Sequence, residues 1–155
     1  FYVKRVAHIL NKVGQDELKK ILDLYYTIPG FIIFPGNQIN KKVTINAARG
    51  FNARICDRFD LTLECIRRYY LGIENPLLEV LNRYSAFFNL FQSFEGYLEF
   101  FLLQDMWDNK ASKIKFFMPF DDGFPTQPIP SNKEEYLGFI QKQSEFVQLR
   151  GQRRI

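Results

Sequence analysis

The sequence predicts a compact, predominantly helical α+β domain with a minor sheet of two or three strands. Several stretches repeat apolar residues at the three- and four-residue spacing of amphipathic helices, whereas only short runs favour strands. The 155 residues fit a single globular domain over 1–155. Aromatic residues make up 17% of the chain, often as doublets, which suits elements that are packed on more than one side.

The first part of the chain is expected to form two helices. Gly14 separates them, the acidic pair at 16–17 suits the first turn of the second helix, and Pro29-Gly30 ends it. The apolar stripes of these helices consist of Val3, Val6, Ile9, Leu10 and Val13, followed by Leu18, Ile21, Leu22 and Tyr25.

Two short apolar runs come next and are typical of strands. Phe31–Phe34 and Val43–Ile45 are rich in β-favouring residues, and Pro35-Gly36-Asn37 lies between them. We therefore expect a small hairpin with a loop of about eight residues.

Residues 54–70 predict the central helix. At about 100° per residue, Phe59 and Leu63 fall in one apolar sector. Leu61 and Cys65 lie four apart among the charged residues, so they stack on one line of the opposite side. Because an exposed helix would not need them there, we expect that side to be partly covered and its ions to pair in a shielded charged cleft. The residues of this cleft are Asp57, Arg58, Glu64 and Arg68.

Three interpretations of this charged side remain open. In the first it is a solvated face with helix ion pairs worth about 0.2–0.5 kcal/mol each, such as Glu64 with Arg68. In the second it is a partly buried network of arginines and carboxylates that ties the helix to its neighbours, since guanidinium groups suit buried pairing. In the third it is a true binding or active site.

The stretch Asn46–Asn52 is expected to lead from the second strand into the central helix. Backbone N–H groups there would point outward, with the positive end of the helix dipole behind them. Arg49 and Arg54 flank that end, and Gly50 would let the backbone approach a ligand closely. A phosphate or carboxylate would then be bound by Asn46, Arg49, Gly50, Asn52 and Arg54. The alternative is that an asparagine only caps the helix while the arginines pair with nearby carboxylates.

The second half of the chain is again mostly helical. Gly72 ends the central helix, and Asn75-Pro76 suits the cap and first turn of the next one. Residues 85–108 are dense in Phe, Leu and Tyr, which predicts two buried helical pieces with a break near residues 93–96.

One more strand and a last helix complete the prediction. Residues 113–117 have a strand pattern, and the Pro- and Gly-rich stretch 119–130 predicts a long loop. Ser131–Glu134 matches a capping box at the start of the last helix. The buried face of that helix is expected to carry Tyr136, Phe139, Ile140, Phe146 and Val147.

Charge and hydropathy restrict the partners. The net charge of +4 is segregated into +6 over residues 1–59, −5 over 60–109 and +3 over 110–155. The basic first third could face nucleic acid, but its excess charge is modest, and we favour a protein partner. No stretch approaches the roughly 18 uninterrupted apolar residues of a membrane span, so we expect a soluble protein without membrane contact.

The cysteines and the first residue bear on the compartment. Cys56 and Cys65 could not bridge across the predicted helix, because nine residues of helix rise about 13.5 Å. Reduced thiols favour a cytoplasmic location. The chain begins with Phe1 rather than with methionine, so we expect an N-terminal piece to precede it.

The inventory of reactive groups is largely negative. His8 is the only histidine, which leaves no convincing Ser-His-Asp, Cys-His or His-rich metal arrangement. No Gly-rich nucleotide loop occurs, and the carboxylates satisfy no metal-ligand spacing. We therefore predict no cofactor and no metal site, and we assign no catalytic residue.

Five segments of the chain form a recognisable set: Phe31–Pro35, Thr44–Asn46, Arg49-Gly50, Asp57–Tyr70 and Phe117–Asp122. Together they resemble a family of bacterial proteins known only as a domain of unknown function. The resemblance covers most of the chain. It implies a bacterial, cytosolic protein, and it implies no activity, cofactor or catalytic residue.

Three classes of function follow. We favour a binding or regulatory module that acts through protein contacts, because this class needs nothing that the sequence lacks. The second class is a nucleic-acid or phosphate-ligand binder that uses the region Arg49–Arg68. The third is an enzyme that acts on phosphodiesters or nucleotides with the same arginines and carboxylates.

Overall fold

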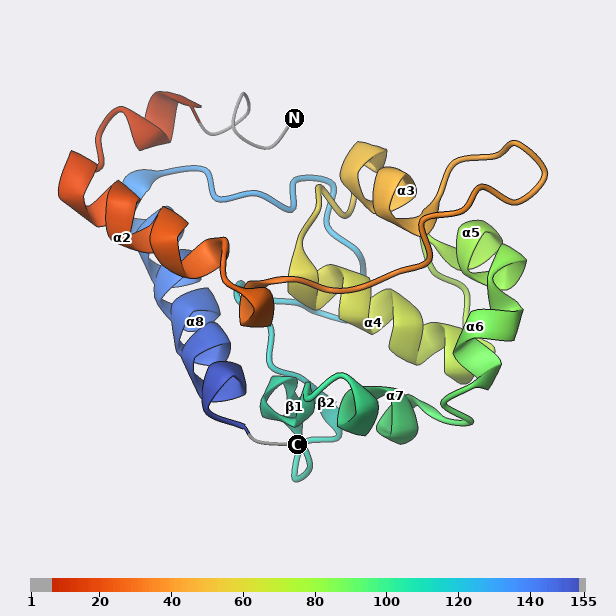
Figure 1. Ribbon diagram of the computed structural model, residues 1–155. Coiled ribbons are helices and arrows are strands. Elements are labelled where there is room, and N and C mark those ends of the chain that lie inside the picture. Colours follow the sequence, from red (N-terminus) through yellow and green to blue (C-terminus); the bar gives the residue numbers. More distant parts are fainter. Residues whose placement is uncertain (1–6, 154–155) are drawn as a thin grey trace.

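The computed structural model describes residues 7–153 and is predominantly helical, with one small antiparallel sheet, as the sequence predicts. Helix α4 lies in the middle of the molecule, and the other elements surround it (Figure 1). In chain order the elements are α2 (Gln15–Tyr25), the short 3-10 helix η1 (Ile28–Gly30), α3 (Ile45–Phe51), α4 (Phe59–Tyr70), α5 (Leu78–Arg83), α6 (Ser85–Asn89), α7 (Phe94–Phe100), the 3-10 helix η2 (Gln104–Met106), β1 (Trp107–Asp108), β2 (Lys113–Ile114) and α8 (Lys133–Gln152).

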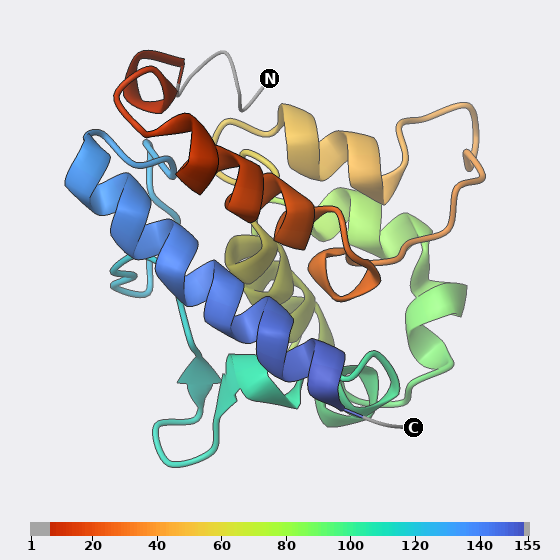
Figure 2. The same cartoon turned by 60° about the vertical axis from the view of Figure 1, so that its left-hand side comes forward.

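Helix α4 is the most enclosed element. Leu61, Leu63 and Ile66 are fully buried, and so is Cys65. Helices α5 and α7 and strand β2 pack directly against α4. The long helix α8 runs beside α2 and also contacts η1 and η2 (Figure 2). The expectation that apolar residues on both sides of the central helix are covered is therefore confirmed.

The central helix begins later than the prediction of residue 54. Cys56 and Asp57, which follow the end of α3 at Phe51, have positive φ values of 48° and 63°, in the left-handed region, and these turn the chain before α4 begins at Phe59. The turn is held by the Asp57 amide, which donates to the Arg49 carbonyl at 3.0 Å. Ile55 is still fully buried, but it reaches the core from a turn rather than from a helix.

The predicted hairpin is absent from the described residues, and the prediction is wrong. Residues 31–34 are extended but unpaired, and Val43–Ile45 leads into α3 instead of forming a strand. The Thr44 hydroxyl accepts from the Ala47 amide at 3.2 Å and so caps α3. Thr44 is β-branched, which favours a strand, but here it caps a helix, and this is why the stretch had a strand-like pattern.

The first helices agree with the prediction where they are described. Gly14 is the N-cap of α2, with Asp16 and Glu17 in its first turn. Ile9 and Val13 are buried in the core. The predicted positions Val3 and Val6 lie outside the described residues.

The local signals that end one helix or precede the next are found in the middle of the chain. Gly72 follows α4 with a φ of +68°, a conformation that suits glycine, and the Asn75 side chain accepts from the Leu77 amide at 3.0 Å just before α5. The Ser93 hydroxyl accepts from the Gly96 amide at 3.0 Å and caps α7. The predicted break near residues 93–96 is therefore the start of α7.

Glycine is required at position 96 by a close backbone approach. A Cβ built there would lie 2.1 Å from the Phe91 carbonyl oxygen, which no side chain can accommodate without moving the backbone. This approach lets α7 pack beneath α6, where rings of neighbouring aromatics meet edge to face or tilted. The cluster consists of Phe87, Phe88, Phe91, Tyr97 and Phe101.

The last helix differs from prediction only in its limits, whereas strand β1 lies at residues 107–108, which were predicted to be helical. Strand β2 covers Lys113–Ile114 and pairs with β1, with Trp107 opposite Ile114. The capping box of α8 lies one residue later than predicted, because Asn132 accepts from the Glu135 amide at 2.9 Å. All the predicted core residues of α8 are buried: Tyr136, Phe139, Ile140, Phe146 and Val147.

Candidate functional site

The charged side of α4 is covered by the chain. Asp60 has no exposed surface, and Arg58 and Glu64 are also buried. The cover comes from the stretch 117–130, which has no helix or strand and of which residues 119–130 were predicted as a loop. We call this stretch the strap.

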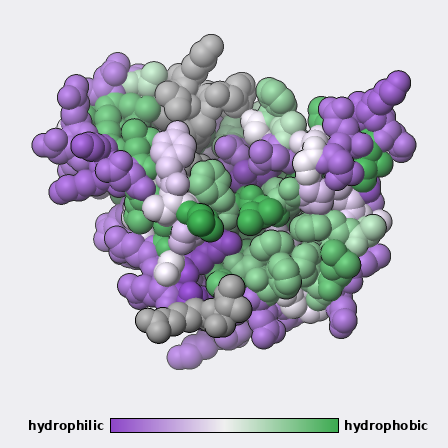
Figure 3. Space-filling model, viewed as in Figure 1, coloured by the Kyte–Doolittle hydropathy of each residue, from purple (hydrophilic) through white to green (hydrophobic). Residues whose placement is uncertain are grey.

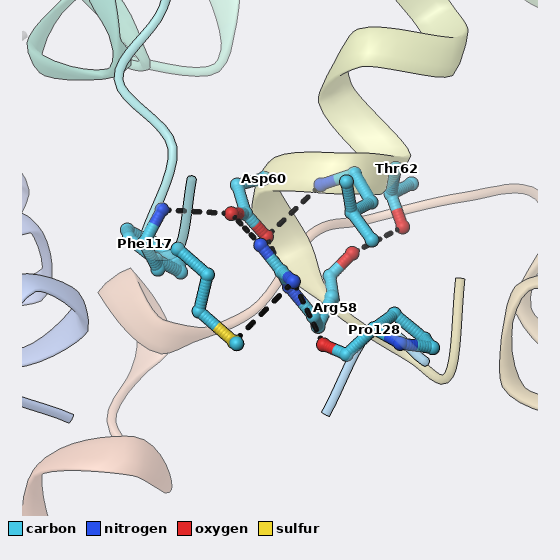
Figure 4. Close-up of polar contacts among 7 residues, drawn as sticks. Arg58, Asp60, Thr62, Phe117 and Pro128 are labelled. Atoms are coloured by element: carbon cyan, nitrogen blue, oxygen red, sulfur yellow. Dashed lines mark hydrogen bonds and ion pairs between the residues drawn. The ribbon is translucent and has the colours of Figure 1, made fainter. Parts of the chain in front are cut away.

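Arg58 and Asp60 form the centre of the covered region (Figure 4). Their side chains are joined by two contacts, the Nη2–Oδ2 ion pair and an Nε–Oδ1 hydrogen bond of 3.0 Å. Asp60 Oδ2 also accepts from the Phe117 amide at 2.8 Å, and Arg58 Nη1 donates to the Pro128 carbonyl at 2.7 Å. The pair therefore fastens both ends of the strap to the beginning of α4.

Glu64 forms a second group one turn further along α4. Its carboxylate accepts from Arg67 through Nε and Nη2, each at 2.8 Å, and from Arg68 Nε at 2.7 Å. Arg68 Nη2 donates to the Asp122 carbonyl at 2.7 Å, and its guanidinium lies 5.0 Å from the centre of the Phe124 ring. Hydrogen bonding to Glu64 raises the pKa of Arg67, so this group stays charged.

Arg49 is buried where α3 meets α4. Its Nε donates to the Thr62 hydroxyl at 3.0 Å, and its Nη2 donates to the Asp57 carbonyl at 2.9 Å. Its Nη1 pairs with the Asp57 carboxylate at 2.6 Å and lies 3.4 Å from Asn46 Oδ1. The side chain thus stabilises the tight turn between the two helices.

The other residues of the predicted anion site lie around the end of α3. The stretch Asn46–Asn52 is helix rather than a loop, so most of its amides are used within α3. Asn52 accepts from the Arg54 amide at 2.9 Å and donates to the Pro76 carbonyl at 3.2 Å. Arg54 is exposed, and its Nη2 donates to the Phe124 carbonyl at 3.1 Å. Gly50 is partly exposed, with open space where a Cβ would lie.

These contacts assemble a buried network of arginines and carboxylates. Arg54, Arg58 and Arg68 each donate to a backbone carbonyl of the strap, at Phe124, Pro128 and Asp122 in turn. Of the three interpretations of the charged side, the geometry agrees with the structural one. A ligand role for the nine predicted site residues stays a prediction.

The chemistry available within this network is limited. Both cysteines are buried and unbridged, and burial raises the pKa of the Cys65 thiol, which disfavours a reactive thiolate. Within residues 7–153, no group of three or more metal-ligating side chains comes together. In the same part of the chain, no helix has the length and apolar character needed to cross a membrane.

An exposed apolar surface lies on another part of the molecule. Figure 3 shows apolar side chains gathered over η1, the extended stretch after it, and the region of α6 and α7. Ile28 is 83% exposed, Leu90 72% and Phe100 69%, although all three are large apolar residues. We call this surface the apolar face and define it by its exposed members Ile28, Phe31, Ile33, Leu90 and Phe100.

Arg150 of α8 holds the two parts of the apolar face together. Its Nη1 donates to the carbonyls of Pro29 and Phe31 at 2.9 and 2.6 Å, and its Nη2 donates to the Phe101 carbonyl at 2.8 Å. Phe100 is next to Phe101 in the chain, and the centre of its ring is 5.0 Å from that of Phe91, which is next to Leu90 in the chain. The apolar face is therefore built on fixed backbone.

Sequence reasoning missed the apolar face because its residues were assigned to buried elements. Phe31 and Ile33 were expected in a hairpin, and Leu90 and Phe100 in buried helices. The available signal was weak, since α6 and α7 are only five and seven residues long and cannot bury every apolar side chain that they carry.

Comparison with known proteins gives one result. A family model described as a family of unknown function (DUF6994) matches residues 1–155, which agrees with the resemblance noted in the sequence. No curated protein and no solved structure matches the chain.

Proposed function

The chain belongs to the DUF6994 family of unknown function, and we propose that it is a binding module that contacts a protein partner through its apolar face. The observation that carries this proposal is the exposure of large apolar side chains together on one surface. Single exposed apolar residues are ordinary, but a contiguous group of them marks an interaction site.

The construction of the apolar face supports this role. Arg150 fixes the backbone on both sides of it, so little ordering is needed on binding. Phe31 and Phe100 are aromatic side chains, the type that often supplies the main contacts of a protein interface. The alternatives that use Arg49–Arg68 come second, because a phosphate or a substrate would have to displace acceptors that these arginines already have.

The test compares two matched variants. Phe100→Asp places a charge in the apolar face, whereas Phe51→Asp places the same charge on α3, where Phe51 is 74% exposed outside that face. A partner is first identified by affinity purification of the wild-type protein from its source cells and is then purified. We expect Phe100→Asp to weaken binding of this partner by at least about tenfold, as for an interface anchor, and Phe51→Asp to leave it unchanged.

Two results would contradict the proposal. One is equal binding by all three proteins in a calorimetric titration. The other is loss of binding in both variants, which would show a general response to added charge rather than contact with the apolar face. Circular dichroism of each variant checks that its fold is intact.

A further inference from the structure

A second surface feature lies away from the apolar face, between the stretch 41–43, α3 and α5. It is a pocket of about 430 Å³, within the size range of small-molecule sites. Both apolar and basic side chains line it. Its lining includes Lys41, Lys42, Val43, Leu77, Glu79 and Arg83.

The basic side chains converge on one carboxylate. Glu79 Oε1 is 3.4 Å from Lys42 Nζ and 3.1 Å from Arg83 Nη1. Lys41 also lines the pocket, so three cationic side chains and one anion are among its lining residues, and the pocket has an excess of positive charge. Glu79 is mostly exposed, which leaves it free to move aside.

Arg83 is held in place but incompletely satisfied. Its Nη2 donates to the Val43 carbonyl at 2.8 Å, which fixes the guanidinium against the wall of the pocket. Its Nε is buried and has no hydrogen-bond partner. Because Nε has almost no exposed surface, a ligand in the pocket would meet the Nη groups of Arg83, which already contact Glu79 and the Val43 carbonyl.

The walls of the pocket are fixed before any ligand binds. The Tyr84 hydroxyl donates to the Asn37 carbonyl at 2.7 Å, which ties the preceding loop to the end of α5. Asn40 and Lys41 both have positive φ values, and these turn the chain so that Lys41 and Lys42 reach the pocket. The Asn52 amide group donates to the Pro76 carbonyl and joins α3 to the start of α5.

We propose that this pocket binds a small organic oxyanion, a phosphate or a carboxylate, that carries an apolar group. The charged end contacts Lys41, Lys42 and Arg83, and the apolar group lies against Val43 and Leu77. This site is independent of the proposed protein contact, because it shares no residue with the apolar face.

Phenyl phosphate and benzoate are the probes, followed by two-dimensional NMR of the full chain. At least one of them is expected to shift the signals of the pocket residues with a Kd below about 1 mM, and the tighter of the two identifies the charged group. Phenol and inorganic phosphate are each expected to bind at least about tenfold more weakly, since each lacks one half of the ligand.

Matched double variants locate the binding. Lys41→Ala with Lys42→Ala is expected to weaken binding of the tighter probe by at least about tenfold. Lys19→Ala with Lys20→Ala removes the same charge from an exposed pair on α2 and is expected to leave binding unchanged. Arg83→Lys keeps the charge but lacks the guanidinium that the Val43 carbonyl holds in place, and it is also expected to weaken binding.

Three outcomes would overturn the proposal. The first is no shift at the pocket with either probe. The second is equal weakening in the α2 double variant, which would mean diffuse attraction to a basic protein. The third is equal binding of inorganic phosphate or phenol, which would mean that the pocket does not recognise an oxyanion with an apolar group.

Discussion

Asp60 is a fully buried residue that joins two separate parts of the chain. Its two oxygens contact Arg58, the Leu61 amide and the Phe117 amide, so α4 and the beginning of the strap share one carboxylate. Removing one member of such a buried ion pair is costly, because the other member is then a buried charge without a partner of opposite sign.

Replacing Asp60 therefore tests the structural interpretation of the charged side. Asp60→Ala leaves Arg58 buried and unpaired, and we expect the free energy of unfolding to fall by about 3–5 kcal/mol in urea denaturation. Asp121→Ala, at an exposed position of the strap, is the control and should change stability by less than about 0.5 kcal/mol. Similar small losses in both variants would show that the Asp60 network is not important for folding.

At the scale of elements, the start of α8 is set by two reciprocal contacts. Asn132 caps the helix, and Glu135 turns back to accept from the Ser131 amide at 2.9 Å and its hydroxyl at 2.6 Å. Hydrogen bonding to Ser131 lowers the pKa of Glu135 from its ordinary value. The charged carboxylate is therefore the form that the folded helix prefers.

The lowered pKa of Glu135 determines how the stability of the α8 cap changes with pH. A pKa that is lower in the folded state gives a stabilising contribution above the ordinary range for Glu, and that contribution is lost as the pH falls through the folded value. We expect the protection of the Ser131 amide from hydrogen exchange, relative to the intrinsic rate at each pH, to fall over that acidic range, as measured by NMR. Glu135→Gln, which does not titrate, should remove this dependence, and its persistence in that variant would assign the effect to another group.

Elements were predictable from the sequence where the signal was local. Gly72, the break before α7, the capping box of α8 to within one residue, and the core positions of α8 depend on neighbours within a few residues. The turn at Cys56 and Asp57 was missed because the helical spacing of apolar residues continues through both positions. The covered charged side of α4 was predicted from Leu61 and Cys65, but its acceptors were not, since backbone carbonyls 54 to 70 residues away leave no pattern in the sequence.

For the whole molecule, the strap is the part that joins the centre of the fold to its surface. It lies over α4 and leads into α8, which in turn packs on α2 and η1. Phe124 and Pro128 are buried, whereas Asp121 and Asp122 are exposed. The strap is therefore held at separate points rather than packed along its whole length.

A comparison of Arg67 with Arg68 tests the hydrogen bond to the strap separately from the ion pair with Glu64. Arg67 and Arg68 both pair with Glu64, but of the two only Arg68 donates to the Asp122 carbonyl, as far as residues 7–153 show. Losing a hydrogen bond from a charged donor costs about 1.5–3 kcal/mol, so we expect Arg68→Ala to speed hydrogen exchange of residues 117–130 by about tenfold or more. Arg67→Ala should leave exchange in the strap close to that of the wild type. If both variants accelerate it equally, Glu64 rather than Arg68 controls the strap.

The way in which the arginines hold the strap has a consequence for protein engineering. A carbonyl oxygen is the same in every amino acid, so Arg54, Arg58 and Arg68 recognise the path of the strap at Phe124, Pro128 and Asp122 without reading the side chains there. Exposed positions such as Asp121 and Thr126 should accept a library of substitutions, provided that Phe120 and Phe124 keep their rings beside Arg68, whereas the φ of 56° at Asp122 disfavours bulky and β-branched residues there. The strap could then serve as a graft site for foreign recognition sequences displayed on an unchanged scaffold.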